Sequence, residues 1–256
     1  MAHKPALLRT FLHTHPDVWD QVFQLDPRRA GFVARLLAST GPTLLDVGCA
    51  TGVLCGELAA RGFQSTGVDL TPAFIQAARR KYSQVPFHVG DMRRLRLRAS
   101  FHVLTCLGTT FLYNVRNEDL TATLASFHRA LRPGGVLLID VVNAMAFIQA
   151  RPFRSTSEHR FLLGNVQATA TLEHTVLEET QCFTEQVTWR VEGRRPRRDP
   201  RSTFRMLFPQ EARHFLEGAG FQDVKILGDF RLSARRLEGP RMLLLARKGV
   251  TQRTRE

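Results

Sequence analysis

Short apolar runs alternate with amphipathic stretches along residues 44–142. Runs with the character of buried strands cover residues 44–47, 63–68, 85–89, 101–106 and 136–142. Helices are predicted between them, over 53–60, from Thr71-Pro72 onward, and over 118–131, where apolar residues recur at spacings of three and four. Such alternation of strands and helices predicts a parallel sheet with helices on its faces. The continuous apolar run of 136–142 indicates a strand covered on both sides.

Beyond residue 150 the pattern changes to the alternation of antiparallel strands. Alternating stretches cover residues 166–172, 180–183 and 186–191, and a helix is predicted at 209–217. Residues 222–227 and 241–247 are then expected to pair as a closing antiparallel hairpin. The sequence therefore predicts a parallel core that a β insertion interrupts and that the end of the chain completes.

The stretch 44–53 carries the strongest functional signal. An apolar strand leads into Asp46, then into a turn that contains Gly48 and Gly52, then into a helix. Glycine allows a positive φ and the close approach of a ligand to the backbone. The helix directs its free N–H groups toward the same place. Such a turn at the carboxyl end of a first strand predicts a nucleotide-type binding site.

Two further acids follow at matching distances. Asp69 lies at the tip of the second strand, about one helix and one strand after Asp46, and Asp91 follows the third strand. A carboxylate in the position of Asp69 can accept hydrogen bonds from both hydroxyls of a ribose. One such acid could simply cap a helix, but three acids in register with a glycine turn favour a single ligand site along one edge of the sheet.

With these motifs the chain resembles the class I S-adenosylmethionine (SAM) dependent methyltransferases over about residues 40–145, in the branch that acts on small molecules, such as the natural-product sugar N-methyltransferases. The resemblance implies SAM as cofactor and S-adenosylhomocysteine (SAH) as its product. The glycine turn would receive the methionine end, Asp69 the ribose and Asp91 the adenine amine. Ala50 replaces the central glycine of the family's turn and is expected to be tolerated. The expected cofactor-binding residues are Asp46, Gly48, Cys49, Ala50, Gly52, Asp69, Leu70, Asp91, Met92 and Leu107.

A nicotinamide dinucleotide enzyme is the nearest rival for the same turn. Its fingerprint is G-x-G-x-x-G, whereas this chain has Gly48-x-x-x-Gly52, and Gly56 already lies on the predicted helix. Asp46 and Asp91 have no place in that fingerprint. The pattern therefore favours SAM.

The resemblance implies an α/β fold: a Rossmann-like, doubly wound, seven-stranded sheet with an antiparallel last strand, an N-terminal helical lid and an antiparallel β insertion after strand five. We expect the lid over residues 1–40 and the SAM-binding core over 41–150. The insertion, over 151–208, is expected to roof the substrate. Residues 209–250 would complete the core, and 251–256 would form a disordered tail.

The acceptor site is expected between the N-terminus, the loop 107–114 and the insertion. Trp19-Asp20 resembles a Tyr-Asp helix that folds over SAM in small-molecule methyltransferases, although an ordinary amphipathic helix is an equal alternative. Tyr113 lies where the sugar N,N-dimethyltransferases place a catalytic histidine, which makes it the catalytic candidate. An ordinary tyrosine pKa of about 10 makes it a poor base, so a role in the pocket wall stays open. The expected substrate residues are Trp19, Thr110, Tyr113, Asn143 and His174, the last with a solvated or structural role as the alternative.

Composition agrees with a globular protein. The hydrophobic fraction is 43%, and no apolar run approaches the roughly 20 residues of a membrane span. The four cysteines have no metal-binding spacing and are expected to be reduced thiols of a cytoplasmic protein. The histidines are scattered, so no metal is expected, and His13 and His15 are expected to be solvated.

The formal net charge of +13 is compatible with more than one kind of binding partner. A basic surface suits nucleic acid or an acidic small substrate. Arginine dominates the basic residues, which suggests codon preference as much as function, and aromatic residues are not interleaved with the basic runs as a stacking surface requires. We therefore expect a small-molecule acceptor, acidic or not, with neither nucleic acid nor membrane as partner. Monomer and dimer both stay open.

The sequence thus predicts transfer of a methyl group from SAM to a nitrogen or oxygen of a small molecule, such as a secondary metabolite. Two alternatives stay open: a SAM-binding enzyme of the same fold that does not methylate, such as a cyclase, and an RNA methyltransferase that uses the arginine surface.

Overall fold

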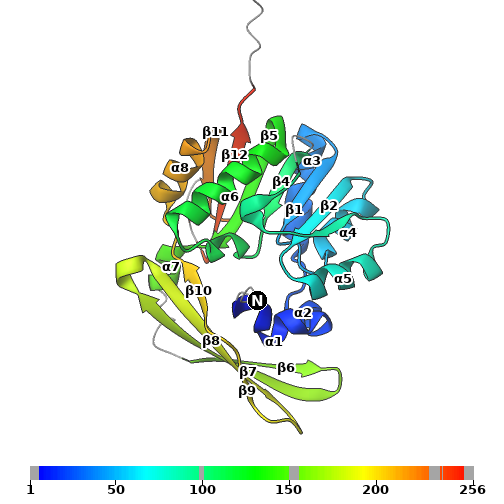
Figure 1. The fold of residues 1–256 in the computed structure, drawn as a ribbon, viewed down its shortest axis with the longest axis vertical. Coiled ribbons are helices and arrows are strands. Elements are labelled where there is room, and N and C mark those ends of the chain that lie inside the picture. Colours follow the sequence, from blue (N-terminus) through cyan, green and yellow to red (C-terminus); the bar gives the residue numbers. More distant parts are fainter. Residues whose placement is uncertain (1–5, 98–100, 150–155, 231–236, 238, 251–256) are drawn as a thin grey trace, which may run out of the picture.

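The computed structural model describes residues 6–97, 101–149, 156–230, 237 and 239–250 (Figure 1). A seven-stranded sheet forms the core, in the order β11-β12-β5-β4-β1-β2-β3. The strands from β1 to β5 are parallel to their neighbours, whereas β12 runs antiparallel to both β5 and β11. The bounds are β1 (Thr43–Val47), β2 (Gln64–Asp69), β3 (Phe87–Val89), β4 (Phe101–Cys106), β5 (Leu131–Val142), β11 (Phe221–Leu227) and β12 (Arg241–Lys248). The predicted α/β fold class is confirmed.

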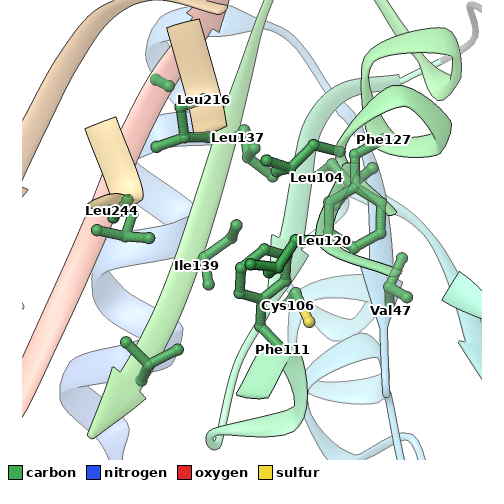
Figure 2. Close-up of a cluster of buried hydrophobic side chains, with 14 of the residues drawn as sticks. Val47, Leu104, Cys106, Phe111, Leu120, Phe127, Leu137, Ile139, Leu216 and Leu244 are labelled. Atoms are coloured by element: carbon green, nitrogen blue, oxygen red, sulfur yellow. The ribbon is translucent and has the colours of Figure 1, made fainter. Parts of the chain in front are cut away.

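Helices cover both faces of this sheet because its strands alternate their side chains between two apolar layers. Leu44 of β1 joins the cluster under α3 (Pro27–Thr40) and α4 (Val53–Ala60), while the next residue, Leu45, joins the cluster under α6 (Asn117–Ala130) and α8 (Pro209–Gly218). α5 (Pro72–Lys81) packs against α4 and β3. Figure 2 shows the α6 and α8 side, where Leu137 and Ile139 of β5 lie among leucines and phenylalanines of both helices.

The predicted β insertion forms a second, antiparallel sheet in the order β10-β8-β7-β6, with β9 paired to β8. Figure 1 shows this sheet apart from the core, with the N-terminal helices between the two. Those helices are α1 (Phe11–Thr14) and α2 (Pro16–Val22), and η1 (Ala6–Arg9) precedes them. The remaining elements are α7 (Ala144–Gln149), β6 (Ser157–Leu163), β7 (Val166–Leu177), β8 (Cys182–Val191), β9 (Arg197–Arg198) and β10 (Ser202–Arg205).

The structure corrects several predicted boundaries. The predicted strands 180–183 and 186–191 are one strand, β8, which follows a single 3-10 turn, η5 (Glu178–Thr180). β6 was not predicted. β5 begins at Leu131 rather than at 136, because Leu131 already pairs with Phe101 and the register then shifts over the intervening residues.

The expected N-terminal lid divides into two parts. α1 and α2 lie toward the second sheet, but α3 belongs to the core, since its Phe32, Val33 and Leu37 are almost fully buried against the main sheet. The predicted tail 251–256 lies outside the described residues.

Candidate active site

A cavity of about 780 Å³ opens at the carboxyl ends of β1, β2 and β4, between the main sheet, the N-terminal helices and the second sheet. This edge is where ligands bind in open α/β sheets, and the volume lies in the range of small-molecule sites. The predicted residues that line it are Trp19, Asp46, Gly48, Cys49, Ala50, Asp69, Leu70, Asp91, Met92, Leu107, Thr110, Tyr113 and His174.

The glycine turn is built from backbone that few residues adopt. Gly48 and Gly52 have φ values of 76° and 80°, and Ala50 lies between them at 47°. Gly52 is the N-cap of α4 and, unlike the other predicted cofactor residues, does not line the cavity, because a Cβ there would meet the Phe87 ring. Ala50 can therefore replace the family's glycine only by adopting a left-handed backbone conformation. Alanine adopts this conformation at a modest cost in free energy.

Asp69 fixes this turn against the second strand. Its Oδ2 accepts a hydrogen bond from the Ala50 backbone N–H at 2.9 Å, and its Oδ1 accepts one from the Thr71 N–H at 2.8 Å. Burial raises the pKa of Asp69, although these backbone hydrogen bonds lower it. Each carboxylate oxygen keeps a second acceptor site. Asp69 thus lines the cavity with a rigidly oriented carboxylate.

Asp46 lies below the turn and is almost fully buried. Its Oδ1 accepts a hydrogen bond from the Thr105 hydroxyl at 2.7 Å. Burial raises the pKa of Asp46 to about 7, against the opposing effect of that hydrogen bond. A cationic ligand beside Asp46 would therefore favour the ionised carboxylate.

Asp91 is held by its own neighbour. The guanidinium of Arg93 donates to both of its oxygens, at 3.0, 3.1 and 2.7 Å, and also reaches Asp119 at 3.1 Å. Burial raises the pKa of Asp91, but the hydrogen bonds from Arg93 outweigh burial and lower the pKa overall. The sulfur of the neighbouring Met92 lies 3.4 Å from the side-chain amide nitrogen of Asn114.

Tyr113 closes the loop after β4, in the 3-10 turn η3 (Thr110–Tyr113). Its ring packs 4.6 Å from that of Phe204, centroid to centroid. Burial, and then the charges of Glu185 and Asp69, raise the pKa of Tyr113 far above its ordinary value. The raised pKa argues against Tyr113 as a proton acceptor near neutral pH, and its place in the cavity wall stays the simpler role.

The Trp19-Asp20 segment lies over the cofactor turn. The Trp19 ring packs 4.8 Å from Phe74 of α5, and Asp20 accepts hydrogen bonds from the Thr51 hydroxyl and the Lys81 ammonium. His13, expected to be solvated, instead stacks 5.2 Å from the same Phe74 and lines the cavity, and burial lowers its pKa to about 4.

A second anchor joins the same N-terminal segment to the β insertion. Asp199 accepts hydrogen bonds from the Phe11 backbone N–H at 2.8 Å and from the Trp189 indole at 2.7 Å. The Phe11 ring packs 4.8 Å from that indole. The N-terminal segment is therefore tied both to the turn at Gly48–Gly52 and to the β insertion.

Asn143 is the exception among the predicted substrate residues. It is not among the residues that line the cavity in the described parts of the chain, because its side-chain amide donates to the Gly239 carbonyl at 3.0 Å and its N–H to that of Pro240. Asn143 thus ties the end of β5 to the segment before β12, and its role as a substrate residue stays a prediction.

Sequence reasoning missed a charged cluster at the cavity wall. Asp140 of β5 is fully buried, and the guanidinium groups of Arg241 and Arg29 lie 2.6 and 3.3 Å from its oxygens. Arg241 also donates to the Thr109 hydroxyl at 3.0 Å. Arg29 and Arg241 both line the cavity, and Arg29 Nε is buried without a hydrogen-bond partner among the described residues. The signal was Asp140 itself, an acid within the continuous apolar run 136–142.

The described residues contain no group of three or more His, Cys, Asp and Glu side chains that could hold a metal ion. No helix in the same residues is long and apolar enough to cross a membrane. The four cysteines are buried free thiols, and burial raises the pKa values of Cys49, Cys55 and Cys106.

Comparison with known proteins agrees with this geometry. Residues 44–135 match the family model described as a methyltransferase domain. The chain is 34% identical over 133 residues to dTDP-4-amino-2,3,4,6-tetradeoxy-D-glucose N,N-dimethyltransferase of Saccharopolyspora spinosa, covering 49% of this chain and 53% of the relative. It is 31% identical over 134 residues to dTDP-3-amino-3,4,6-trideoxy-alpha-D-glucopyranose N,N-dimethyltransferase of Streptomyces venezuelae, covering 49% and 56%. The chain thus spans about half the length of these curated relatives.

Solved structures show the same fold over nearly the whole chain. The crystal structure of DesVI from Streptomyces venezuelae superposes with a TM-score of 0.75 at 24% identity, over 92% of this chain and 98% of that one. The sugar N-methyltransferase KedS8 from a Streptoalloteichus species gives a TM-score of 0.75 at 21% identity, over 91% and 92%. These structures show the fold alone, a Rossmann-like α/β architecture. The match of residues 44–135 to the methyltransferase-domain model agrees with the resemblance inferred from the sequence.

Proposed function

We propose that this protein is a SAM-dependent methyltransferase that acts on a nitrogen of a small molecule of the amino-sugar class. The observation that supports the proposal is the oriented carboxylate of Asp69 beside the turn at Gly48–Gly52. Both lie at the carboxyl ends of the parallel strands, where the cavity opens. The donor and acceptor groups around this turn suit an adenosyl group with a charged amino-acid end.

Each part of SAM has a fitting group in the cavity wall. The two open acceptor sites of Asp69 suit the ribose hydroxyls, and Asp91 with Met92 suits the adenine edge. Arg29, whose buried Nε has no hydrogen-bond partner in the part of the chain that the structure describes, suits the methionine carboxylate. When bound, SAM supplies a methyl group activated by a positive sulfur, and the residues of the chain position the partners and exclude water.

The rest of the cavity is suited to a small acceptor. Phe147, Phe183 and Phe204 line it beside Tyr113, on the side of the β insertion. The relatives named above act on dTDP-linked amino sugars, which supports an amine nitrogen as the methylated atom. The guanidinium groups of Arg29 and Arg241 in the cavity wall can donate hydrogen bonds to an acceptor that carries phosphate, such as a sugar nucleotide. The four free thiols agree with a reducing, cytoplasmic setting.

Methyl transfer to defined acceptors tests the proposal. The purified protein is incubated with SAM and, separately, with the two dTDP-amino sugars of the relatives' names, simple amines, phenols and a short RNA, and products are identified by mass spectrometry. We expect SAH and a product heavier by one or two methyl groups with an amino sugar. Methylation of RNA alone, or SAH binding without transfer to any acceptor, would contradict the proposed substrate class.

A further inference from the structure

Two titratable side chains of the β insertion face each other at the cavity. His174 of β7 lies directly across from Glu185 of β8, and His174 Nε2 is 3.0 Å from Glu185 Oε2. Both residues line the cavity, with 11% and 29% of their side chains exposed. The pair therefore reaches the space assigned to the acceptor.

Aromatic rings surround the pair. The His174 ring packs edge-on against Phe147 at 5.8 Å and against Phe183 at 6.1 Å. Phe183 stacks on Phe204 at 5.1 Å, and Phe204 contacts Tyr113 at 4.6 Å. This apolar wall fixes the orientation of the imidazole and limits water around it, which strengthens the interaction between the ring and the carboxylate.

The hydrogen bond assigns a chemical role to each nitrogen. A neutral imidazole whose Nε2–H donates to Glu185 keeps its lone pair on Nδ1. The Glu185 carboxylate then stabilises the imidazolium that forms when Nδ1 takes up a proton. His174 is thus equipped as a proton acceptor, whereas Tyr113 is not.

We propose that His174, oriented and charge-balanced by Glu185, removes the proton from the ammonium form of the acceptor so that its nitrogen can attack. This inference rests on the proposed function. The N–H bond of the acceptor breaks, its electron pair stays on nitrogen, and a new Nδ1–H bond gives an imidazolium beside the Glu185 carboxylate. The neutral nitrogen then forms the bond to the methyl carbon, while the electron pair of the C–S bond passes to sulfur and gives SAH.

The need for such a group follows from amine chemistry. An aliphatic amine, with an ordinary pKa near the 10.4 of a lysine side chain, is almost fully protonated at neutral pH and then has no lone pair to donate. A second methyl transfer would need the same step again, because the first leaves a protonated secondary amine. His174 is the catalytic residue in this assignment, and Glu185 is a positioning residue.

Tyr113 of η3 is the titratable group near the pair whose surroundings the structure links to it, because the charge of Glu185, together with that of Asp69 at the end of β2, raises the pKa of Tyr113. Glu173, the neighbour of His174 on β7, points to the other side of the strand and pairs with Arg198 at 3.0 Å. The pH profile of the His174 variant is therefore compared with the pH profile of a variant whose altered residue lies away from the pair.

Steady-state methylation between pH 6.5 and 10 tests the inference, with dTDP-3-amino-3,4,6-trideoxy-alpha-D-glucopyranose as the probe and His174→Gln as the variant. We expect kcat/KM of His174→Gln to fall by about 100-fold at pH 7, as for loss of a general base. The rate should then rise about tenfold per pH unit and approach that of the unaltered protein once the amine is already neutral. Glu185→Gln should show a smaller loss with the same recovery.

The matched control is His159→Gln, on the neighbouring strand β6 and exposed to solvent. It should leave the profile unchanged. A His174→Gln loss that stays constant across the pH range, or no loss at all, would overturn the inference. SAH affinity measured by calorimetry should be equal in all variants, which separates this outcome from a damaged fold.

A second readout does not depend on turnover. With ¹⁵N-histidine labelling and SAH present, addition of the amino sugar should change the chemical shifts of the His174 nitrogens, because the acceptor nitrogen contacts the ring at Nδ1, with His174→Gln identifying the resonances. Unshifted resonances, with the sugar bound, would overturn the inference even where transfer is slow. Failure of the unaltered protein to bind SAH at all would instead overturn the proposed function, and this inference with it.

Discussion

Replacement of Asp46 by asparagine should make the folded state more stable, and increasingly so as the pH rises. Asp46 is 4% exposed and has one side-chain hydrogen-bond partner, the Thr105 hydroxyl. Burial raises its pKa from 3.8 to about 7, and the charge of Asp69 adds to the rise. Asparagine can accept the same hydrogen bond but is never charged.

The sign follows from proton binding. Because the folded pKa lies above the unfolded one, the folded state binds more protons between pH 4 and 7, and the free energy of unfolding falls as the pH rises through that window. The loss of stability caused by the buried Asp46 carboxylate is absent well below pH 4 and reaches its full value above pH 7. At about 1.36 kcal/mol per unit, it grows from roughly 2 kcal/mol at pH 5 to roughly 4 kcal/mol at pH 8.

Urea unfolding of both proteins at pH 5 and pH 8, without ligand, measures this difference. We expect the stability advantage of Asp46→Asn to be about 2 to 3 kcal/mol larger at pH 8 than at pH 5. Asp17→Asn, exposed on α2, serves as the control and should change stability by less than about 0.5 kcal/mol. An Asp46→Asn advantage that is equal at both pH values would refute the assignment of a desolvated carboxylate under the turn.

Three further predictions concern the cofactor site. Asp69→Ala should lower SAH affinity by 100-fold or more in calorimetry while circular dichroism shows the fold intact, since two ribose hydrogen bonds to a charged group are lost; unchanged affinity would mean that another group holds the ribose. Arg29→Met should weaken SAH binding by about tenfold but leave adenosine binding unchanged, because only SAH carries the carboxylate; equal losses would argue against a carboxylate contact. Asp20→Asn should speed SAH dissociation in stopped-flow fluorescence of Trp19 by releasing Lys81 from the lid, and an unchanged rate would show that the lid opens elsewhere.

The cofactor half of the site could be predicted from sequence because its parts repeat with the period of the fold. Asp46 and Asp69 lie at the carboxyl ends of β1 and β2, and Asp91 follows β3, so linear spacing along these parallel strands already implies a shared edge. The turn at Gly48 is local and needs no knowledge of distant residues.

The pairing of His174 with Glu185 could not be predicted, although His174 itself was, because it depends on register between distant segments. His174 and Glu185 meet only because β7 and β8 pair with those two residues opposite each other. Residues 184–185 were wrongly predicted to separate two strands. A polar residue that faces a cavity looks the same in the sequence as one that faces solvent. Thr184 there is in fact 6% exposed.

The charged cluster at the wall was missed for a related reason. Arg29 and Arg241 lie far apart in the chain and both reach Asp140 from separate elements. In a sequence with 36 lysines and arginines, no local feature distinguishes these two from the rest. The contacts of Asn143 with the segment before β12 likewise join residues far apart in the chain, so no local pattern could indicate them.

Titration calorimetry of the purified protein with SAH is the most direct test of the central claim, that the turn at Gly48–Gly52 and Asp69 form an adenosyl-binding site. We expect binding at one site per chain, with a dissociation constant of about 1 to 100 µM, as is common for enzymes and their small ligands. No heat with SAM or SAH at millimolar concentration, from protein that is folded by circular dichroism, would contradict it.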